Sequence, residues 1–134
     1  MGAPSLLIAL NDATLGAELA KLLAADGFDV DVVSSAAGAQ NQAEEKAYQV
    51  VILDEVVEAV RGPELYERIE RAQEEIEGIL CAENPTLETV QIALDFGMKR
   101  VVAKPIDAAE IRSLVREAAR NAAPRTARAD GPVP

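Results

Sequence analysis

The chain has 134 residues, of which 49% are hydrophobic and only 3% aromatic, so it can form one domain with an aliphatic, alanine-rich core. Its formal net charge of −10 argues against direct contact with nucleic acid, because phosphate backbones bind clustered lysine and arginine. The sequence contains no histidine, which removes Ser-His-Asp catalysis and histidine-based zinc sites from consideration.

No segment of the sequence has the features of an export signal or a membrane span. The first residues lack a basic region, and no apolar run reaches the roughly 20 residues that cross a bilayer. The single cysteine, Cys81, has apolar neighbours and cannot form an internal disulfide. We therefore expect a cytoplasmic protein without a membrane partner.

Two strand–helix units are predicted first. A buried strand is expected over residues 6–10, and leucines at helical spacing then predict a helix that follows Asn11 and Asp12 and ends at Gly27. Residues 28–33 contain three valines and predict a short second strand. The next helix is indicated by alanines at positions 36, 39, 43 and 47, which give it a thin apolar face.

Residues 50–54, Val-Val-Ile-Leu-Asp, are the most informative stretch of the sequence. An unbroken aliphatic run of this kind is typical of a strand buried on both faces, in a parallel sheet covered by helices. Its terminal acid, Asp54, would lie at the carboxyl edge of the sheet, where open α/β folds bind ligands. Lys104 follows the last predicted strand at the same edge. We predict that the Asp54 carboxylate and the Lys104 ammonium lie within hydrogen-bonding reach, or one water apart.

The second half of the chain continues the alternation of strands and helices. Residues 61–64 are expected to form a loop that places Pro63 at the first position of a third helix. The inward residues of that helix are predicted to be Leu65, Ile69, Ala72 and Ile76. Residues 79–82 predict a fourth strand. Thr86 can cap a fourth helix that ends at Gly97, and its predicted inward residues are Leu87, Val90 and Leu94.

A fifth strand over residues 101–103 precedes Lys104 and Pro105, and Asp107 with Glu110 forms a capping box for the last helix. The predicted inward residues of this helix are Ile111, Leu114, Val115 and Ala118. Basic residues recur on this helix at every fourth position: Arg112, Arg116 and Arg120. They form either a solvated face or part of a docking or dimer surface.

Five strands that alternate with helices predict an α/β fold, a doubly wound five-stranded parallel sheet with helices on both faces. We expect this domain to span residues 1–121. Residues 122–134 contain several helix breakers and no apolar period, so they are predicted to be a flexible tail or a truncated linker.

A spaced set of residues lies on this pattern: Asp54 ends the third strand, Gly62 follows it, Gly97 precedes the fifth strand, and Lys104 and Pro105 come after it. The set resembles the receiver domain of two-component response regulators. The resemblance implies a flavodoxin-like receiver fold with strand order 2-1-3-4-5. It also implies phosphorelay signal transduction rather than enzyme activity. The implied partner is a histidine kinase or another signalling protein, with a homodimer through the last helix and fifth strand, as in many receivers.

In that family an aspartate accepts a phosphoryl group with the help of Mg²⁺, which neutralises negative charge that would repel the incoming group. The match implies that Asp54 is the phosphoacceptor and that Lys104 contacts the phosphoryl oxygens. It further implies that the metal is held by Asp54, the backbone carbonyl of Val56 and a residue after the first strand. A cis peptide bond is implied before Pro105.

Several family positions carry other residues in this chain. Leu10 and Asn11 stand where the family has two acids; Leu10 cannot bind a cation, and Asn11 offers Mg²⁺ only a neutral oxygen. Asp12 could substitute only if the loop shifted by one residue. Ala82 replaces the hydroxyl that acts as the family's switch, and Val101 replaces its mobile aromatic residue. We therefore expect a weak or absent Mg²⁺ site and an incomplete switch.

Three functions remain open on these residues. The first is a receiver that is phosphorylated on Asp54 and has an altered output. The second is a pseudo-receiver, a phosphorylation-independent protein–protein interaction module in which Asp54 and Lys104 form a fixed ion pair. Asn11 or Asp12 could in either case cap the first helix. The third, a flavodoxin-like enzyme or cofactor binder, is weakest because no glycine-rich phosphate loop follows the first strand.

Overall fold

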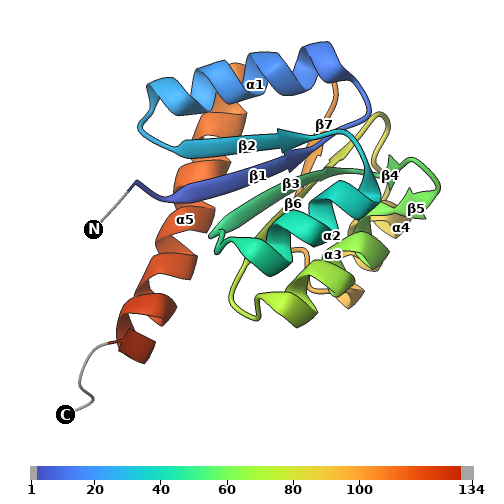
Figure 1. The fold of residues 1–134 in the computed structure, drawn as a ribbon. Helices are drawn as coiled ribbons and strands as arrows, with labels where there is room; N and C mark the ends of the chain where they lie inside the picture. The colour runs from blue at the N-terminus through green and yellow to red at the C-terminus, as the bar shows by residue number, and fades with distance from the viewer. Residues whose placement is uncertain (1–2, 131–134) are drawn as a thin grey trace.

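The computed structural model describes the backbone of residues 3–130 and the side chains of residues 3–122. Five parallel strands form one sheet in the order β2-β1-β3-β6-β7 (Figure 1). Their bounds are β1 Ser5–Ala9, β2 Asp29–Val33, β3 Val50–Asp54, β6 Glu77–Ala82 and β7 Arg100–Ala103. Counted along the chain, this is the predicted order 2-1-3-4-5, so the doubly wound α/β fold is confirmed.

Helices cover both faces of the sheet, as Figure 1 shows. Their bounds are α1 Ala13–Ala25, α2 Ala36–Glu45, α3 Gly62–Ala72, α4 Leu87–Asp95 and α5 Ala108–Asp130. One apolar core, beneath α1 and α5, takes Val50 and Ile52 of the central strand. The other, beneath α2, α3 and α4, takes Val51 and Leu53. Because successive side chains of a strand point to opposite faces, both cores need apolar residues, which explains the unbroken run at residues 50–53.

The strand register brings the ends of three strands together around Asp54. Ala9, the last residue of β1, pairs with Leu53 of β3, so the chain leaves β1 beside Asp54. Asp54 itself pairs with Cys81 of β6, and the next residue of β6, Ala82, pairs with Ala103 of β7. Asn11 and Lys104 therefore leave the sheet on opposite sides of Asp54.

The predicted helix caps are present. The Asp12 carboxylate accepts hydrogen bonds from the backbone N–H groups of Thr14 and Leu15, at 2.9 and 3.1 Å. Thr86 and Thr89 form a reciprocal capping box at the start of α4, and Asp107 accepts from the N–H of Glu110 at 2.8 Å. Gly27 follows α1 with a φ of 98°, a left-handed conformation that glycine adopts without strain.

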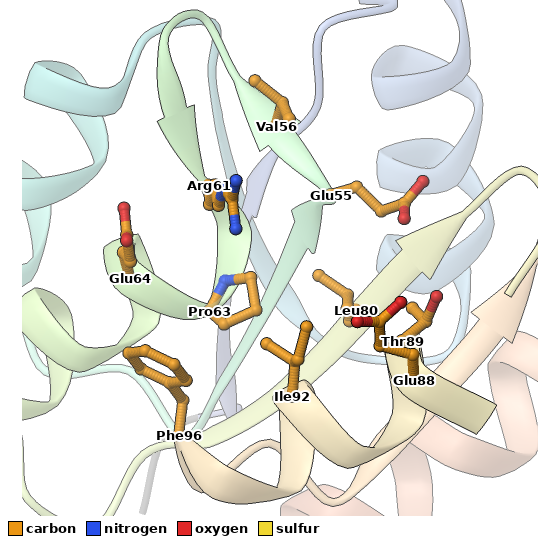
Figure 2. Close-up of a pocket in the computed structure, with 10 residues that line it drawn as sticks. All are labelled: Glu55, Val56, Arg61, Pro63, Glu64, Leu80, Glu88, Thr89, Ile92 and Phe96. Carbon is orange, nitrogen blue, oxygen red and sulfur yellow. The ribbon is translucent and has the colours of Figure 1, made fainter. Parts of the chain in front are cut away.

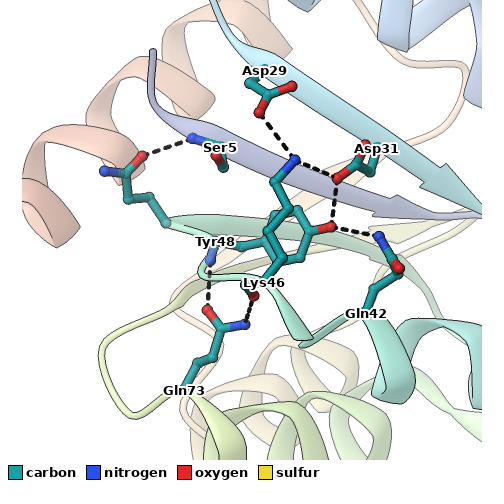
Figure 3. A network of polar contacts seen from close by, with 8 residues as sticks. Ser5, Asp29, Asp31, Gln42, Lys46, Tyr48 and Gln73 are labelled. Carbon is teal, nitrogen blue, oxygen red and sulfur yellow. Dashed lines mark hydrogen bonds and ion pairs between the residues drawn. The ribbon is translucent and has the colours of Figure 1, made fainter. Parts of the chain in front are cut away.

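A polar network fixes the end of α2 to the edge strand β2, at the opposite end of the sheet from Asp54 (Figure 3). Lys46 Nζ lies 2.7 Å from the carboxylate of Asp31 and 3.0 Å from that of Asp29. The hydroxyl of the buried Tyr48 donates to Asp31 at 2.6 Å. The Gln73 side chain accepts from the Tyr48 N–H at 2.6 Å and donates to the backbone carbonyls of Ala43 in α2 and of Lys46 just after it. These bonds hold the segment between α2 and β3 in place.

The prediction for the inward face of α4 is wrong. Leu87, Val90 and Leu94 are 89, 38 and 49% exposed, and Ala93 is the buried residue of the helix. The sequence of α4 has apolar residues on two flanks, so helical spacing alone could not decide which flank faces the sheet. Because β7 is the edge strand, no further strand covers the flank that carries Leu87, Val90 and Leu94.

Other boundaries also differ from the predictions. The loop expected after Asp54 contains a short antiparallel hairpin, β4 Val56–Val57 and β5 Val60–Arg61. Ala47 lies beyond α2 and is exposed, and Ile76 is buried in the loop after α3 rather than on the helix.

The last helix runs beyond the predicted tail boundary. α5 continues to Asp130, so residues 122–130, expected to be flexible, are helical, and residues 131–134 lie outside the described residues. Alanine and arginine are strong helix formers, and Ala122 is buried, which together outweigh the breaker at Pro124. The domain boundary at residue 121 stays a prediction. Within residues 3–130, none of the helices has the length and apolar character needed to traverse a bilayer.

Two glycines provide a matched test of this packing. A Cβ on Gly62 would overlap the backbone carbonyl oxygen of Asp54 and lie 2.7 Å from Cδ1 of Leu80. Gly62→Ala should therefore lower the free energy of unfolding by about 1–3 kcal/mol in urea titrations. A Cβ on Gly16 of α1 would meet only Val32 at an ordinary 3.4 Å. Gly16→Ala should leave stability unchanged or raise it by up to about 1 kcal/mol, and equal losses for the two variants would contradict the packing described here.

Candidate functional site

The site is organised around a buried carboxylate, Asp54, which is 3% exposed at the carboxyl end of β3. Lys104, the residue after β7, places its Nζ 2.6 Å from Asp54 Oδ1. The predicted proximity of the two charges is thus confirmed. The contact is an ion pair between a buried carboxylate and a partly buried ammonium. The predicted cis bond between Lys104 and Pro105 is also present.

The second carboxylate oxygen of Asp54 is also occupied. Oδ2 accepts a hydrogen bond from the backbone N–H of Asn11 at 2.7 Å. A buried carboxylate is tolerated only when charge and hydrogen bonds compensate its lost hydration. The Lys104 ammonium and the Asn11 N–H supply this compensation from the two sides of β3.

The protonation states of Lys104 and Cys81 are determined by their burial and by the nearby charge of Asp54. Partial burial pushes the pKa of Lys104 down, but the contact with Asp54 and its charge outweigh this effect and raise the pKa above its usual value. Burial, and secondarily the charge of Asp54, raises the pKa of the Cys81 thiol to about 12. At neutral pH the site therefore holds an ammonium and a neutral thiol.

The side chain of Asn11 binds the loop that follows Asp54. Its Nδ2 donates to the backbone carbonyl of Val56, and its Oδ1 accepts from the backbone N–H of Glu58 at 3.2 Å. The carbonyl of Val56 is the backbone group that the family resemblance assigns to the metal. In this structure the amide of Asn11 already occupies that carbonyl.

Glu58 extends the same chain of contacts to α2. It has a φ of 57°, a left-handed conformation that costs a non-glycine residue on the order of 1 kcal/mol. Its Oε1 accepts from the backbone N–H of Ala36, in the first turn of α2, at 2.9 Å. An acid at a helix N-terminus is favourable, which helps to offset the strained backbone. The hairpin is thus tied both to Asn11 and to α2.

The donor set does not fit Mg²⁺ in this arrangement. Mg²⁺ prefers carboxylates and water in octahedral geometry, and Asp54, the one carboxylate expected at the site, faces an ammonium. Asn11 and the Val56 carbonyl bind each other, and Asp12 caps α1. Among the described residues, no group of three or more His, Cys, Asp or Glu side chains could hold a metal ion.

The two residues that the resemblance aligns with the family's switch lie in neighbouring strands of the sheet, Ala82 in β6 and Val101 in β7. Ala82 ends β6 with 1% exposure, and its carbonyl accepts from the N–H of Lys104 at 2.8 Å. Val101 is half-buried in β7. A methyl group at residue 82 has no donor for a phosphoryl oxygen. The pocket over Asp54 and Lys104 has a volume of about 200 Å³, and the exposed acids Glu55 and Glu83 contribute to its lining.

The family model for the response regulator receiver domain matches residues 6–116. The chain therefore belongs to the response regulator receiver domain family. The fold agrees with this family assignment, because its five-stranded sheet is flavodoxin-like. Among curated proteins, no sequence matches the chain.

Solved structures of receivers share this fold. The signal receiver domain of an HD domain-containing protein from Pseudomonas fluorescens aligns with a TM-score of 0.87 and 22% identity, over 96% of this chain and 95% of that one. A CheY-like receiver domain protein from Methanospirillum hungatei gives 0.86 and 17%, over 92 and 99%. The receiver domain of a sensor histidine kinase from Pseudomonas aeruginosa, with a magnesium ion in its active-site cleft, gives 0.78 and 18%, over 89 and 99%.

Two residues of the site were not assigned these roles from the sequence. Cys81 has apolar neighbours in the sequence, but its place beside Asp54 depends on the register of β3 and β6. Glu58 stands near the acceptor in the sequence, but its bond to α2 joins residues 22 apart. No local sequence pattern predicts that contact.

The coupling between Asp54 and Lys104 can be measured with a double-mutant cycle. Asp54→Asn, Lys104→Met and the double variant should give a coupling free energy of about 1–3 kcal/mol in urea unfolding, because each single change leaves the other charge uncompensated. The same cycle on the exposed pair Glu67 and Arg71, 3.7 Å apart on α3, should give less than about 0.5 kcal/mol. Equal couplings in the two cycles would contradict a special role for the buried pair.

The raised pKa of Cys81 predicts an inert thiol. A group with a pKa of about 12 is almost wholly protonated at pH 8, and Cys81 is also fully buried. Ellman's reagent at pH 8 should therefore react slowly with the folded protein and rapidly after unfolding in guanidinium chloride. Rapid stoichiometric reaction of the folded chain would show that the end of β6 is open to solvent.

Proposed function

We propose that this receiver domain is a pseudo-receiver, which acts in two-component signalling through protein contacts and with little or no phosphoryl transfer to Asp54. The observation that carries the proposal is the position of the Asn11 amide on the Val56 carbonyl and the Glu58 N–H. These bonds occupy the Asn11 side chain and the Val56 carbonyl, two groups that the family resemblance assigns to the metal.

The chemistry of phosphoryl transfer supports this proposal. Transfer to a carboxylate depends on cations that neutralise the phosphoryl oxygens, and Mg²⁺ usually supplies most of that charge. Here Lys104 is the cation nearest to Asp54. A phosphoryl group on Asp54 would also find only the methyl of Ala82 at the switch position. Without contacts that differ between two states, such a group cannot shift their populations.

A second candidate function is phosphorylation of Asp54 itself. The observation in its favour is that Asp54 and Lys104 lie in contact and both line a surface pocket. In this candidate the domain would be a phosphoacceptor with an altered output. The two candidates differ in one measurable property, the uptake of a phosphoryl group.

Intact-protein mass after incubation with acetyl phosphate and Mg²⁺ tests both candidates. The natural chain should gain no phosphoryl mass. Asn11→Asp should gain it, because the change removes the donor to the Val56 carbonyl and adds a carboxylate beside Asp54. Asp54→Asn in the Asn11→Asp background is the matched control and should abolish the gain. An adduct on the natural chain that Asp54→Asn removes would overturn the pseudo-receiver and establish the second candidate.

The proposed partners are those of a signalling module: a histidine kinase or another signalling protein in the cytoplasm, without direct contact to nucleic acid or membrane. Receiver domains are generally signalling modules rather than enzymes. A homodimer through α5 and β7 is also proposed. The exposed Leu87, Val90 and Leu94 of α4 support it, because α4 packs against β7 and would extend that surface.

A further inference from the structure

A groove beside the Asp54 pocket, which shares Glu55 and Val56 with that pocket, lies between α4 and the segment formed by the β4–β5 hairpin and the start of α3 (Figure 2). It has a volume of about 340 Å³, at the lower end of the size range of ligand pockets. Ile92 and Phe96 of α4 line one side, and Pro63 of α3 lines the other. Leu80 of β6, 1% exposed, forms the floor.

The groove exists because α3 and α4 pack against different elements of the fold and not against each other along their length. α3 packs closely against α2, whereas α4 packs against β7. Ala93 is the only residue of α4 that is fully buried, so the flank with Ile92 and Phe96 is covered only in part. The space between the two helices is therefore lined with apolar side chains and open to solvent on one side.

The rim of the groove is acidic. Three glutamates from three different segments surround it, Glu55 after β3, Glu64 in α3 and Glu88 in α4, together with one basic residue, Arg61. Figure 2 shows the four charged side chains around the apolar floor. None of them forms a hydrogen bond or an ion pair through its side chain with the described part of the chain. Their charges are therefore available to a ligand.

We propose that this groove docks an amphipathic segment of a partner protein, one that inserts a bulky apolar side chain between Ile92 and Pro63 and places lysine or arginine residues against the glutamates. The apolar floor supplies the buried anchor point that binding interfaces typically contain. The acidic rim attracts basic residues of a partner and disfavours the binding of acidic segments. The occupant is thus identified by charge as well as by shape.

A second copy of the chain is a poorer occupant. Each copy carries a formal net charge of −10, so a second copy offers a mostly acidic surface to a rim that attracts basic segments. The groove also lies on the flank of α4 opposite to Leu87 and Leu94, which face the side of β7. Docking in the groove therefore leaves the proposed dimer surface free.

Fluorescence anisotropy with the full chain tests the proposal. The probe is a fluorescein-labelled synthetic peptide with leucine and lysine at helical spacing, and the control probe has glutamate in place of each lysine. The lysine peptide should bind, and Glu64→Gln/Glu88→Gln should weaken its binding by about fivefold, because two ion pairs are lost. Ile92→Ala should weaken it by a similar factor, because the apolar anchor loses its contact. Circular dichroism verifies that each variant is folded.

The matched control is Glu18→Gln/Glu44→Gln, which changes the net charge equally on α1 and α2, far from the groove; it should leave binding unchanged. In amide NMR spectra, the peptide should shift Val56, Ile92 and Phe96. Equal weakening by the control pair, an Ile92→Ala variant that binds normally, or equal binding of the glutamate peptide would each overturn the proposal. Loss of a dimer in light scattering on Glu64→Gln/Glu88→Gln would overturn it in favour of a second copy.

Discussion

The carboxylate of Asp54 sets the constraint that the rest of the site obeys. It stands at the end of a strand whose two faces are covered by helices and is only 3% exposed, so water compensates little of its charge. A cation must come from one neighbouring strand and a hydrogen-bond donor from the other, and Lys104 and the Asn11 N–H meet these needs. The parallel register makes this possible, because it delivers both residues to the same edge of the sheet.

Strong local patterns predicted the strands and the Asp54–Lys104 pair, whereas the strand order was implied by the resemblance to receiver domains. An aliphatic run ending in an acid allows few alternatives in an α/β chain. Asp12 was likewise recognised as a possible cap, because capping needs only residues two and three positions away.

The predictions that failed or were missing depend on contacts between distant residues. The outward face of α4 follows from the position of β7 at the sheet edge, which no pattern within Leu87–Asp95 contains. The contacts of Asn11 with Val56 and Glu58 join segments more than forty residues apart, and they change an apparent metal ligand into a structural one. For the same reason the groove beside α4 could not be predicted, because its lining comes from five separate elements, β4, β5, α3, β6 and α4.

Val56 belongs both to the site around Asp54 and to the groove beside α4. Its carbonyl accepts a hydrogen bond from Asn11, and its side chain, which is 44% exposed, lines the groove. A ligand that displaces this residue changes the free energy of the contacts around Asp54, and a change at Asp54 alters the affinity of the groove by the same factor, because such linkage is reciprocal. A single two-strand hairpin therefore gives the domain a thermodynamic connection between its carboxylate and its surface. In such a domain the signal is the binding of a partner in the surface groove, and the response is a change in the contacts of the Asp54 carboxylate.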